Sequence, residues 1–167
     1  MSHEIKIKEL TLENFKPYGS FSALINPTAR GNGLPGMSFH ADLEVLELGT
    51  AHAAAFSVTR VTNALPHVIV ALEKHSHCGE GIVSLDGDML VYFAPAGADY
   101  AAALKEVEAF IVPKGVMLTI RPGVWHCCPY TVNTEVIHVL NVLPERTYAN
   151  DCTMKMLAQD ERIRILG

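Results

Sequence analysis

The feature that most constrains the fold is a succession of short segments with strand character, separated by turn signals. Each segment is rich in Val, Ile, Leu or Phe and is too short for an ordinary helix. These segments are residues 43–48, 55–62, 68–75, 81–85, 89–94, 110–112, 116–120 and 135–143. Turn signals such as Asp86-Gly87 and Pro122-Gly123 lie between them. Many short strands with frequent turns indicate an all-β sandwich or barrel.

Few segments have helical character. Residues 99–107 (DYAAALKEV) and 153–159 are predicted to be helical, and a short helix over 11–15 is predicted to begin at Thr11, whose hydroxyl can cap it. The Gly-, Pro- and Asn-rich stretch 26–36 is predicted to be a loop. No linker separates compositionally different halves of the 167 residues, so we expect a single domain over 1–167.

Charge and hydropathy restrict the partners. The formal net charge is −5 and the 13 Lys and Arg residues are scattered, which argues against nucleic acid and anionic membranes as partners. No run approaches the roughly 18 apolar residues of a membrane span, and the N-terminal residues lack a signal-peptide core. We therefore expect a cytoplasmic protein. The four cysteines, of which Cys127 and Cys128 are adjacent, do not suggest a secreted disulfide framework and are expected to be small buried residues.

The segment 68–75 places chemically active side chains together. Side chains on a strand alternate between its two faces, so Glu73, His75 and His77 are expected to share one face. Two imidazoles two residues apart on one face point towards the same place. This is a geometry that a metal ion can use.

Two motifs extend this observation. His75-Ser-His77-Cys-Gly-Glu80 stands at the end of the segment, and Pro122-Gly-Val-Trp-His126 follows farther along the chain. Their order resembles the cupin superfamily, whose first motif contains His-x-His and then Glu, and whose second has Pro and Gly shortly before a His. The resemblance implies a cupin fold, a double-stranded β-helix or jelly-roll barrel with a few short helices. It also implies that His75, His77, Glu80 and His126 bind a metal ion.

Three imidazoles and one carboxylate suit a single divalent transition metal ion, namely Zn²⁺, Mn²⁺, Fe²⁺ or Ni²⁺. Such a ligand set leaves one or two positions open for water or a substrate. In this sequence Glu80 follows His77 by three residues, one or two fewer than in the usual cupin motif.

Further segments are similar to the ureidoglycolate lyase family. They are the opening segment Leu10–Gly19, Arg60, Leu65-Pro66, Glu73-Lys74-His75, Val124-Trp125-His126 with Pro129, and Asn150-Asp151-Cys152. Cys127 stands where that family commonly has a second His. The resemblance implies an enzyme that splits ureidoglycolate, or a closely related small hydroxy or keto acid, into glyoxylate and urea.

This reaction needs a base for the hydroxyl group, an acid for the leaving nitrogen and a cation for the carboxylate. The metal ion would bind the carboxylate and hydroxyl together. Arg60, which matches an arginine of the family, is the candidate for gripping the carboxylate, although a surface position on a strand explains it equally well. Glu73 and Lys74 are candidates for proton transfer or for an ion pair beside the strand. Tyr92 is a candidate hydrogen-bond donor to the ligand.

Two other functions remain open, because one fold carries many chemistries. The chain could be another metal-dependent enzyme, an isomerase or dioxygenase acting on a small metabolite, or a non-catalytic module that binds a small molecule or sugar. In each case we expect a homodimer, since exposed β-branched strand edges need to be covered.

Overall fold

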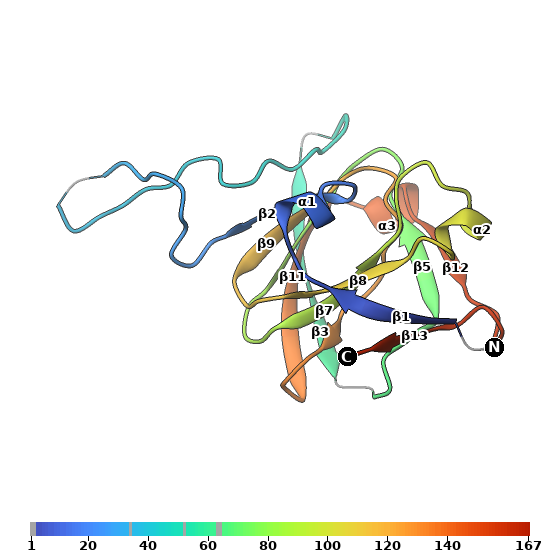
Figure 1. Ribbon diagram of the computed structural model, residues 1–167. Helices are drawn as coiled ribbons and strands as arrows, with labels where there is room; N and C mark the ends of the chain where they lie inside the picture. Colours follow the sequence, from blue (N-terminus) through green and yellow to red (C-terminus); the bar gives the residue numbers. More distant parts are fainter. Residues whose placement is uncertain (1–2, 34, 52, 63–64) are drawn as a thin grey trace.

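The computed structural model describes residues 3–33, 35–51, 53–62 and 65–167, which form two β-sheets packed face to face (Figure 1). The six-stranded sheet has the order β10 (Tyr130–Thr131), β7 (Met89–Phe93), β8 (Glu108–Val112), β1 (His3–Lys8), β13 (Ile163–Leu166) and β4 (Val68–Ile69). The five-stranded sheet has the order β2 (Gly19–Ala23), β9 (Val116–Ile120), β6 (Glu80–Ser84), β11 (Val136–Pro144) and β3 (Ala54–Thr62). A third, two-stranded sheet pairs β12 (Thr153–Met156) with β5 (Ala71–Lys74).

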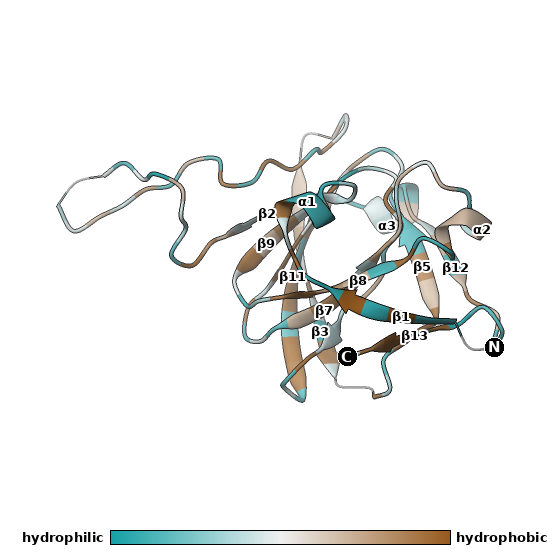
Figure 2. Ribbon diagram, in the orientation of Figure 1, coloured by the Kyte–Doolittle hydropathy of each residue, from teal (hydrophilic) through white to brown (hydrophobic). Residues whose placement is uncertain are grey.

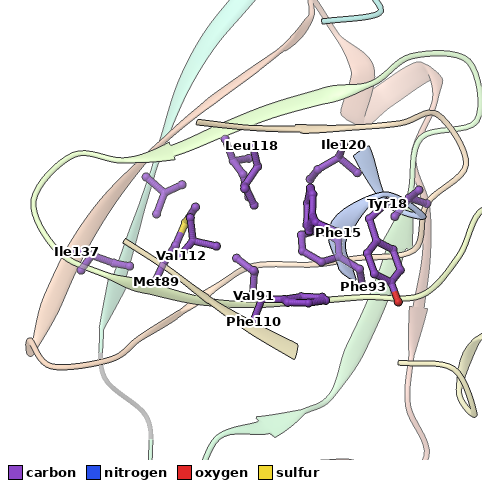
Figure 3. Close-up of a cluster of buried hydrophobic side chains, with 13 residues drawn as sticks. Phe15, Tyr18, Met89, Val91, Phe93, Phe110, Val112, Leu118, Ile120 and Ile137 are labelled. Atoms are coloured by element: carbon purple, nitrogen blue, oxygen red, sulfur yellow. The ribbon is translucent and has the colours of Figure 1, made fainter. Parts of the chain in front are cut away.

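The main core lies between the two large sheets (Figure 3). Alternate residues of β7, β9 and β11 point into it, as the twofold periodicity of a strand requires. The short helix α1 (Leu12–Phe15) adds Phe15, whose ring lies 5.3 Å from that of Phe93 and 5.8 Å from that of Phe110. Thr11 caps this helix, because its hydroxyl oxygen accepts a hydrogen bond from the backbone N–H of Asn14. The aromatic cluster therefore closes the interior around α1.

A second core covers the outer face of the six-stranded sheet. Leu90, Tyr92 and Ala94 point into it and pack with Leu72 and Trp125, among others. Strand β7 is consequently buried on both faces, and all five of its residues are buried. Double burial explains why β7 is a continuous apolar run (MLVYF) instead of an alternating one. In Figure 2 the ribbon of β13, whose Ile163 and Ile165 belong to this core, is brown near the C-terminus.

The predicted fold class is confirmed. The described residues are mostly strand and loop with three four-residue helices, α1, α2 (Tyr100–Ala103) and α3 (Thr147–Asn150), and the curled sheets form the expected cupin barrel. The predicted strands 55–62, 81–85, 89–94, 110–112, 116–120 and 135–143 correspond to β3, β6, β7, β8, β9 and β11. The predicted strand 68–75 is divided at Val70 into β4 and β5, which belong to different sheets. Among the described residues no helix is long and apolar enough to cross a membrane.

Three predictions about local structure were wrong, and hydrogen bonding explains two of them. Residues 43–48 form no strand. The Glu44 carboxylate accepts hydrogen bonds from the hydroxyl groups of Ser20 and Thr119, and the Glu47 carbonyl accepts one from the Gly79 N–H, so this segment is held by side-chain and loop contacts instead of a strand ladder. Residues 153–159 are not helical, since their first four form β12 and pair with β5. Residues 99–107 contain only the single turn α2, capped by Asp99. The sequence patterns also missed β1, β2, β10 and β13.

Phe15→Ala is expected to destabilise the fold by about 3–5 kcal/mol, because truncation leaves a cavity inside the aromatic cluster. Urea unfolding followed by circular dichroism would measure the free energy of unfolding. Leu12→Ala is the matched control, since Leu12 lies on the same helix but is 70% exposed, and it should change stability by no more than about 0.5 kcal/mol. Equal losses in the two variants would contradict the assigned role of Phe15.

Candidate metal centre

Three buried side chains, Glu73, His75 and His126, meet inside the barrel. Each offers one ligand atom, and these three atoms lie within 4.8 Å of one another. An antiparallel bridge joins the two motifs that supply them: the Glu73 N–H donates to the His126 carbonyl at 2.6 Å, and the His126 N–H donates to the Glu73 carbonyl at 2.8 Å. Residues more than 50 positions apart in the sequence are thereby held at one place by backbone hydrogen bonds.

The two imidazoles are both oriented by backbone carbonyls. His75 Nδ1 lies 2.6 Å from the carbonyl oxygen of Asp151, and His126 Nδ1 lies 2.9 Å from that of Val124. A carbonyl oxygen can only accept, so each Nδ1 carries a proton and each Nε2 is directed into the site. Metal-binding histidines are held in this way in proteins. Among the described residues, the buried Nε2 of His75 has no hydrogen-bond partner.

Glu80 completes the group. Its Oε2 atom lies 2.8 Å from His126 Nε2 and 3.4 Å from His75 Nε2, while Oε1 accepts a hydrogen bond of 2.9 Å from the Asn141 amide. Ligands bound at about 2.1 Å to one ion lie roughly 3.0–3.4 Å apart, so the 3.4 Å spacing suits a shared ion and the 2.8 Å spacing is slightly shorter, as a hydrogen bond is. Glu80 therefore reaches the imidazoles of His75 and His126 although it follows His77 by only three residues in the sequence.

The charges of this group are coupled. Burial alone would raise the pKa of Glu80, but the hydrogen bond from His126 and the nearby His75 imidazole outweigh it and hold that pKa far below its usual range. Burial alone would lower the pKa of His126, but its hydrogen bond to Glu80 raises it. The hydrogen bond between His126 and Glu80 thus favours the charged form of each partner, and a metal ion bound at this place would displace its proton.

His77 is not brought into this group. The backbone N–H groups of Ser76 and His77 donate to the Asp151 carboxylate at 2.8 Å each instead of continuing the ladder of β5. Strand alternation therefore stops after Lys74, and the His77 side chain is 86% exposed with Nδ1 3.0 Å from Asp151 Oδ1. The structure accordingly places this predicted ligand outside the buried group.

Three predicted catalytic residues also lie away from the group. Arg60 is exposed on the outer face of β3. The Lys74 ammonium group lies 4.5 Å from the centre of the Trp125 ring, in a cation–π contact. Tyr92 is buried in the second core, where burial raises its pKa and its hydroxyl donates to the Ala71 carbonyl at 3.2 Å. Of the four predicted catalytic residues, only Glu73 belongs to the buried group.

A cavity of about 280 Å³ opens beside the candidate ligand atoms. Its polar lining includes Thr59, Glu73, Glu80, His126, Asn141 and Tyr148, and its lining contains two carboxylates but no Lys or Arg. Such a lining repels an anion unless a cation is bound first. Cys127 and Cys128 also line this cavity, contrary to the expectation that the cysteines are buried, because only Cys78 is fully buried.

Sequence patterns missed several of these cavity residues. Asn141 interrupts the apolar face of β11 with an inward polar group, and its amide oxygen accepts a 2.8 Å hydrogen bond from the Thr59 hydroxyl. A polar residue on the apolar face of a strand was therefore an available signal. Tyr148 lies in α3 with no comparable pattern, and the Asn150-Asp151-Cys152 segment gave Asp151 no role, so only the folded chain relates these two residues to His75.

The chain is similar to one family and to several known proteins. A family model described as ureidoglycolate lyase matches residues 2–164, a range that includes both motifs of the site. A ureidoglycolate lyase from Rhodobacter capsulatus is 28% identical over 125 residues, which are 73% of this chain and 75% of that protein. A dTDP sugar isomerase from Desulfovibrio desulfuricans G20 superposes with a TM-score of 0.49 at 16% identity, covering 86% of this chain and 87% of the other. Oxalate decarboxylase from Bacillus subtilis, a structure with Mn(II) centres, gives 0.44 at 13% identity over 62% and 24% of the chains.

His75→Ala or His126→Ala is expected to weaken the binding of a divalent transition metal ion. The loss of metal affinity should exceed the roughly 10- to 100-fold that results when a residue hydrogen-bonded to a metal ligand is removed. Titration calorimetry and elemental analysis of the purified protein would measure affinity and stoichiometry. His77→Ala is the control, because its exposed side chain lies outside the group. If His77→Ala lost as much metal as His75→Ala, the assigned centre would be wrong.

Proposed function

The chain belongs to the ureidoglycolate lyase family and is an enzyme of the lyase class, and we propose that it splits ureidoglycolate into glyoxylate and urea with one bound divalent metal ion. The observation that carries this proposal is the pair of buried Nε2 atoms directed at Glu80, beside a cavity whose lining contains no Lys or Arg. An anionic hydroxy acid would enter such a cavity only if a positive ion neutralised its carboxylate.

His75, Glu80 and His126 would hold the ion. Glu80 Oε2 has both Nε2 atoms within 3.4 Å, and the Asn141 amide keeps its other oxygen in place. A bound divalent ion supplies positive charge for the substrate's carboxylate and hydroxyl oxygens and lowers the pKa of that hydroxyl. Arg60 is not needed for this role, which agrees with its position on the outer face of the barrel.

Glu73 is then available as the base. Its carboxylate lines the cavity and accepts a hydrogen bond from the Cys152 thiol, a weak donor, at 3.5 Å. Glu73 would take the proton of the substrate hydroxyl while the C–O bond becomes a carbonyl and the C–N bond breaks. The same carboxyl group would return that proton to the leaving ureido nitrogen, which releases urea and restores Glu73.

The remaining cavity residues would position the substrate. The Tyr148 side chain lies at the cavity with its ring 5.9 Å from that of His75. Burial raises the pKa of Tyr148, so its hydroxyl stays protonated and is suited to donate a hydrogen bond to a substrate oxygen. A volume of about 280 Å³ has room for a small acid of this kind.

Glu73→Gln is expected to lower kcat by about 10²- to 10⁴-fold, because removing a general base has effects of this size. Metal content should stay unchanged, which separates the base from the ligands. The measurements are steady-state release of glyoxylate and urea, together with elemental analysis. Lys74→Gln is the matched control, since the neighbouring side chain packs on Trp125 and should leave turnover near that of the wild type.

Two results would count against this proposal. If the metal-loaded wild type released no glyoxylate or urea above background, ureidoglycolate would not be the substrate. If Glu73→Gln lost its metal along with its activity, Glu73 would be a ligand and the base would have to be another group.

A further inference from the structure

One short segment near the C-terminus contacts the candidate metal centre. It comprises residues 147–152, which are helix α3 and the two residues after it, and Figure 1 shows α3 beside β5. The Tyr148 ring of this segment lies 5.9 Å from the His75 ring. The Cys152 thiol donates a hydrogen bond of 3.5 Å to the Glu73 carboxylate. An imidazole and a carboxylate of the centre are therefore both in contact with residues 147–152.

Asp151 makes more of these contacts than its neighbours. Its backbone carbonyl lies 2.6 Å from Nδ1 of His75 and accepts that proton. Its carboxylate accepts hydrogen bonds of 2.8 Å from the backbone N–H groups of Ser76 and His77, and a longer one of 3.6 Å from the Cys78 thiol. One residue is thus bonded to four successive residues that lie more than 70 positions away in the sequence.

Helix α3 cannot place the Asp151 carbonyl by itself. It is a single turn whose N-cap residue, Arg146, makes no side-chain capping bond, and an isolated turn of helix is not stable. The segment is held at its two ends instead. The Thr147 hydroxyl donates to the Pro144 carbonyl at 2.7 Å at the first end, and the Asp151 carboxylate binds the turn after β5 at the second. Loss of the carboxylate would release the second end, and with it the carbonyl that orients His75.

The turn after β5 depends on the same carboxylate. Residues 76–78 belong to no strand, and the N–H groups of Ser76 and His77 donate to Asp151 in place of a neighbouring strand. Hydrogen bonds to a carboxylate are roughly twice as strong as those between neutral groups. The two bonds therefore fix the backbone directly after His75, while the Asp151 carbonyl fixes its ring.

We propose that Asp151 is a positioning residue of the metal centre, whose carboxylate joins the end of α3 to the turn after β5 so that its carbonyl holds the His75 ring with Nε2 directed into the site. This inference rests on the proposed metal-dependent function, because His75 is one of the ligands named there. Asp151 is not among the residues that line the cavity, so it acts through His75 and does not contact a substrate.

A second aspartate supplies a matched control. The Asp86 carboxylate accepts a 2.7 Å hydrogen bond from the backbone N–H of His138 and lies 2.6 Å from Nδ1 of the same residue. The carboxylate of Asp151 has the same two contacts with His77, at 2.8 and 3.0 Å. Asp86 lies in the turn between β6 and β7 and does not line the cavity. Its substitution removes similar hydrogen bonds without affecting His75.

Titration calorimetry with Mn²⁺ on the full chain measures the effect on metal affinity. Mn²⁺ is the probe because it prefers oxygen and nitrogen ligands to the thiols that also line the cavity. Asp151→Ala is expected to weaken binding by about 10- to 100-fold, the usual effect of removing a residue that supports a ligand. Asp151→Asn keeps one acceptor oxygen and should lose less, and it carries the test if the alanine variant does not fold. Asp86→Ala should bind Mn²⁺ as the wild type does.

Nuclear magnetic resonance of the metal-free protein with ¹⁵N-labelled histidine gives a readout that a general loss of stability would not change. The Nδ1 proton of His75 should be protected from exchange with water in the wild type and in Asp86→Ala, and should lose this protection in Asp151→Ala.

Three results would overturn the proposal: unchanged Mn²⁺ affinity in Asp151→Ala, an equal loss of affinity in Asp86→Ala, or a His75 Nδ1 proton that stays protected without the Asp151 carboxylate. Neither measurement uses ureidoglycolate, so failure of the proposed reaction would leave both intact. If the wild type bound no metal ion, the metal-dependent function would fail, and the exchange of the His75 proton would still decide whether Asp151 positions that ring.

Discussion

Two backbone hydrogen bonds between Glu73 and His126 hold the candidate site together. They join the end of β5 to the segment after β9, and the neighbouring bridge from Ala94 to Trp125 joins the same segment to β7. The imidazole of His126 and the carboxylate of Glu73 are thus mounted on paired backbone and not on free loops. A site that must hold ligand atoms to within a fraction of an ångström depends on this kind of support.

The double burial of β7 supplies the rigidity behind these bridges. One face of the strand packs in the aromatic core with Phe15, and the other packs in the second core with Trp125. Because close-packed interiors transmit small displacements, the position of the Trp125–His126 segment is tied to both cores. The Lys74 ammonium group packs on the ring of the same Trp125, so this cation does not lie in the cavity.

The charges of the cavity follow from this arrangement. With Lys74 on Trp125 and Arg60 outside the barrel, the two imidazoles are the basic side chains that the described structure places beside Glu73 and Glu80. Burial makes each unbalanced charge costly, which is why Glu80 takes hydrogen bonds from His126 and Asn141 at once. The cavity is therefore suited to a cation first and to an anionic substrate second.

Strand periodicity and motif order were sufficient to predict the all-β barrel and to single out His75, Glu80 and His126, because these signals depend on residues close together in the sequence. Alternation also suggested that His77 points with His75, but Asp151, 74 residues away, takes the backbone N–H groups of Ser76 and His77 and ends the strand first. The roles of β5 and β12, the outward position of Arg60 and the contacts of Lys74 likewise depend on partners distant in the sequence. The sequence determined which groups are able to bind a metal ion, whereas long-range hydrogen bonds and packing decided which of them meet.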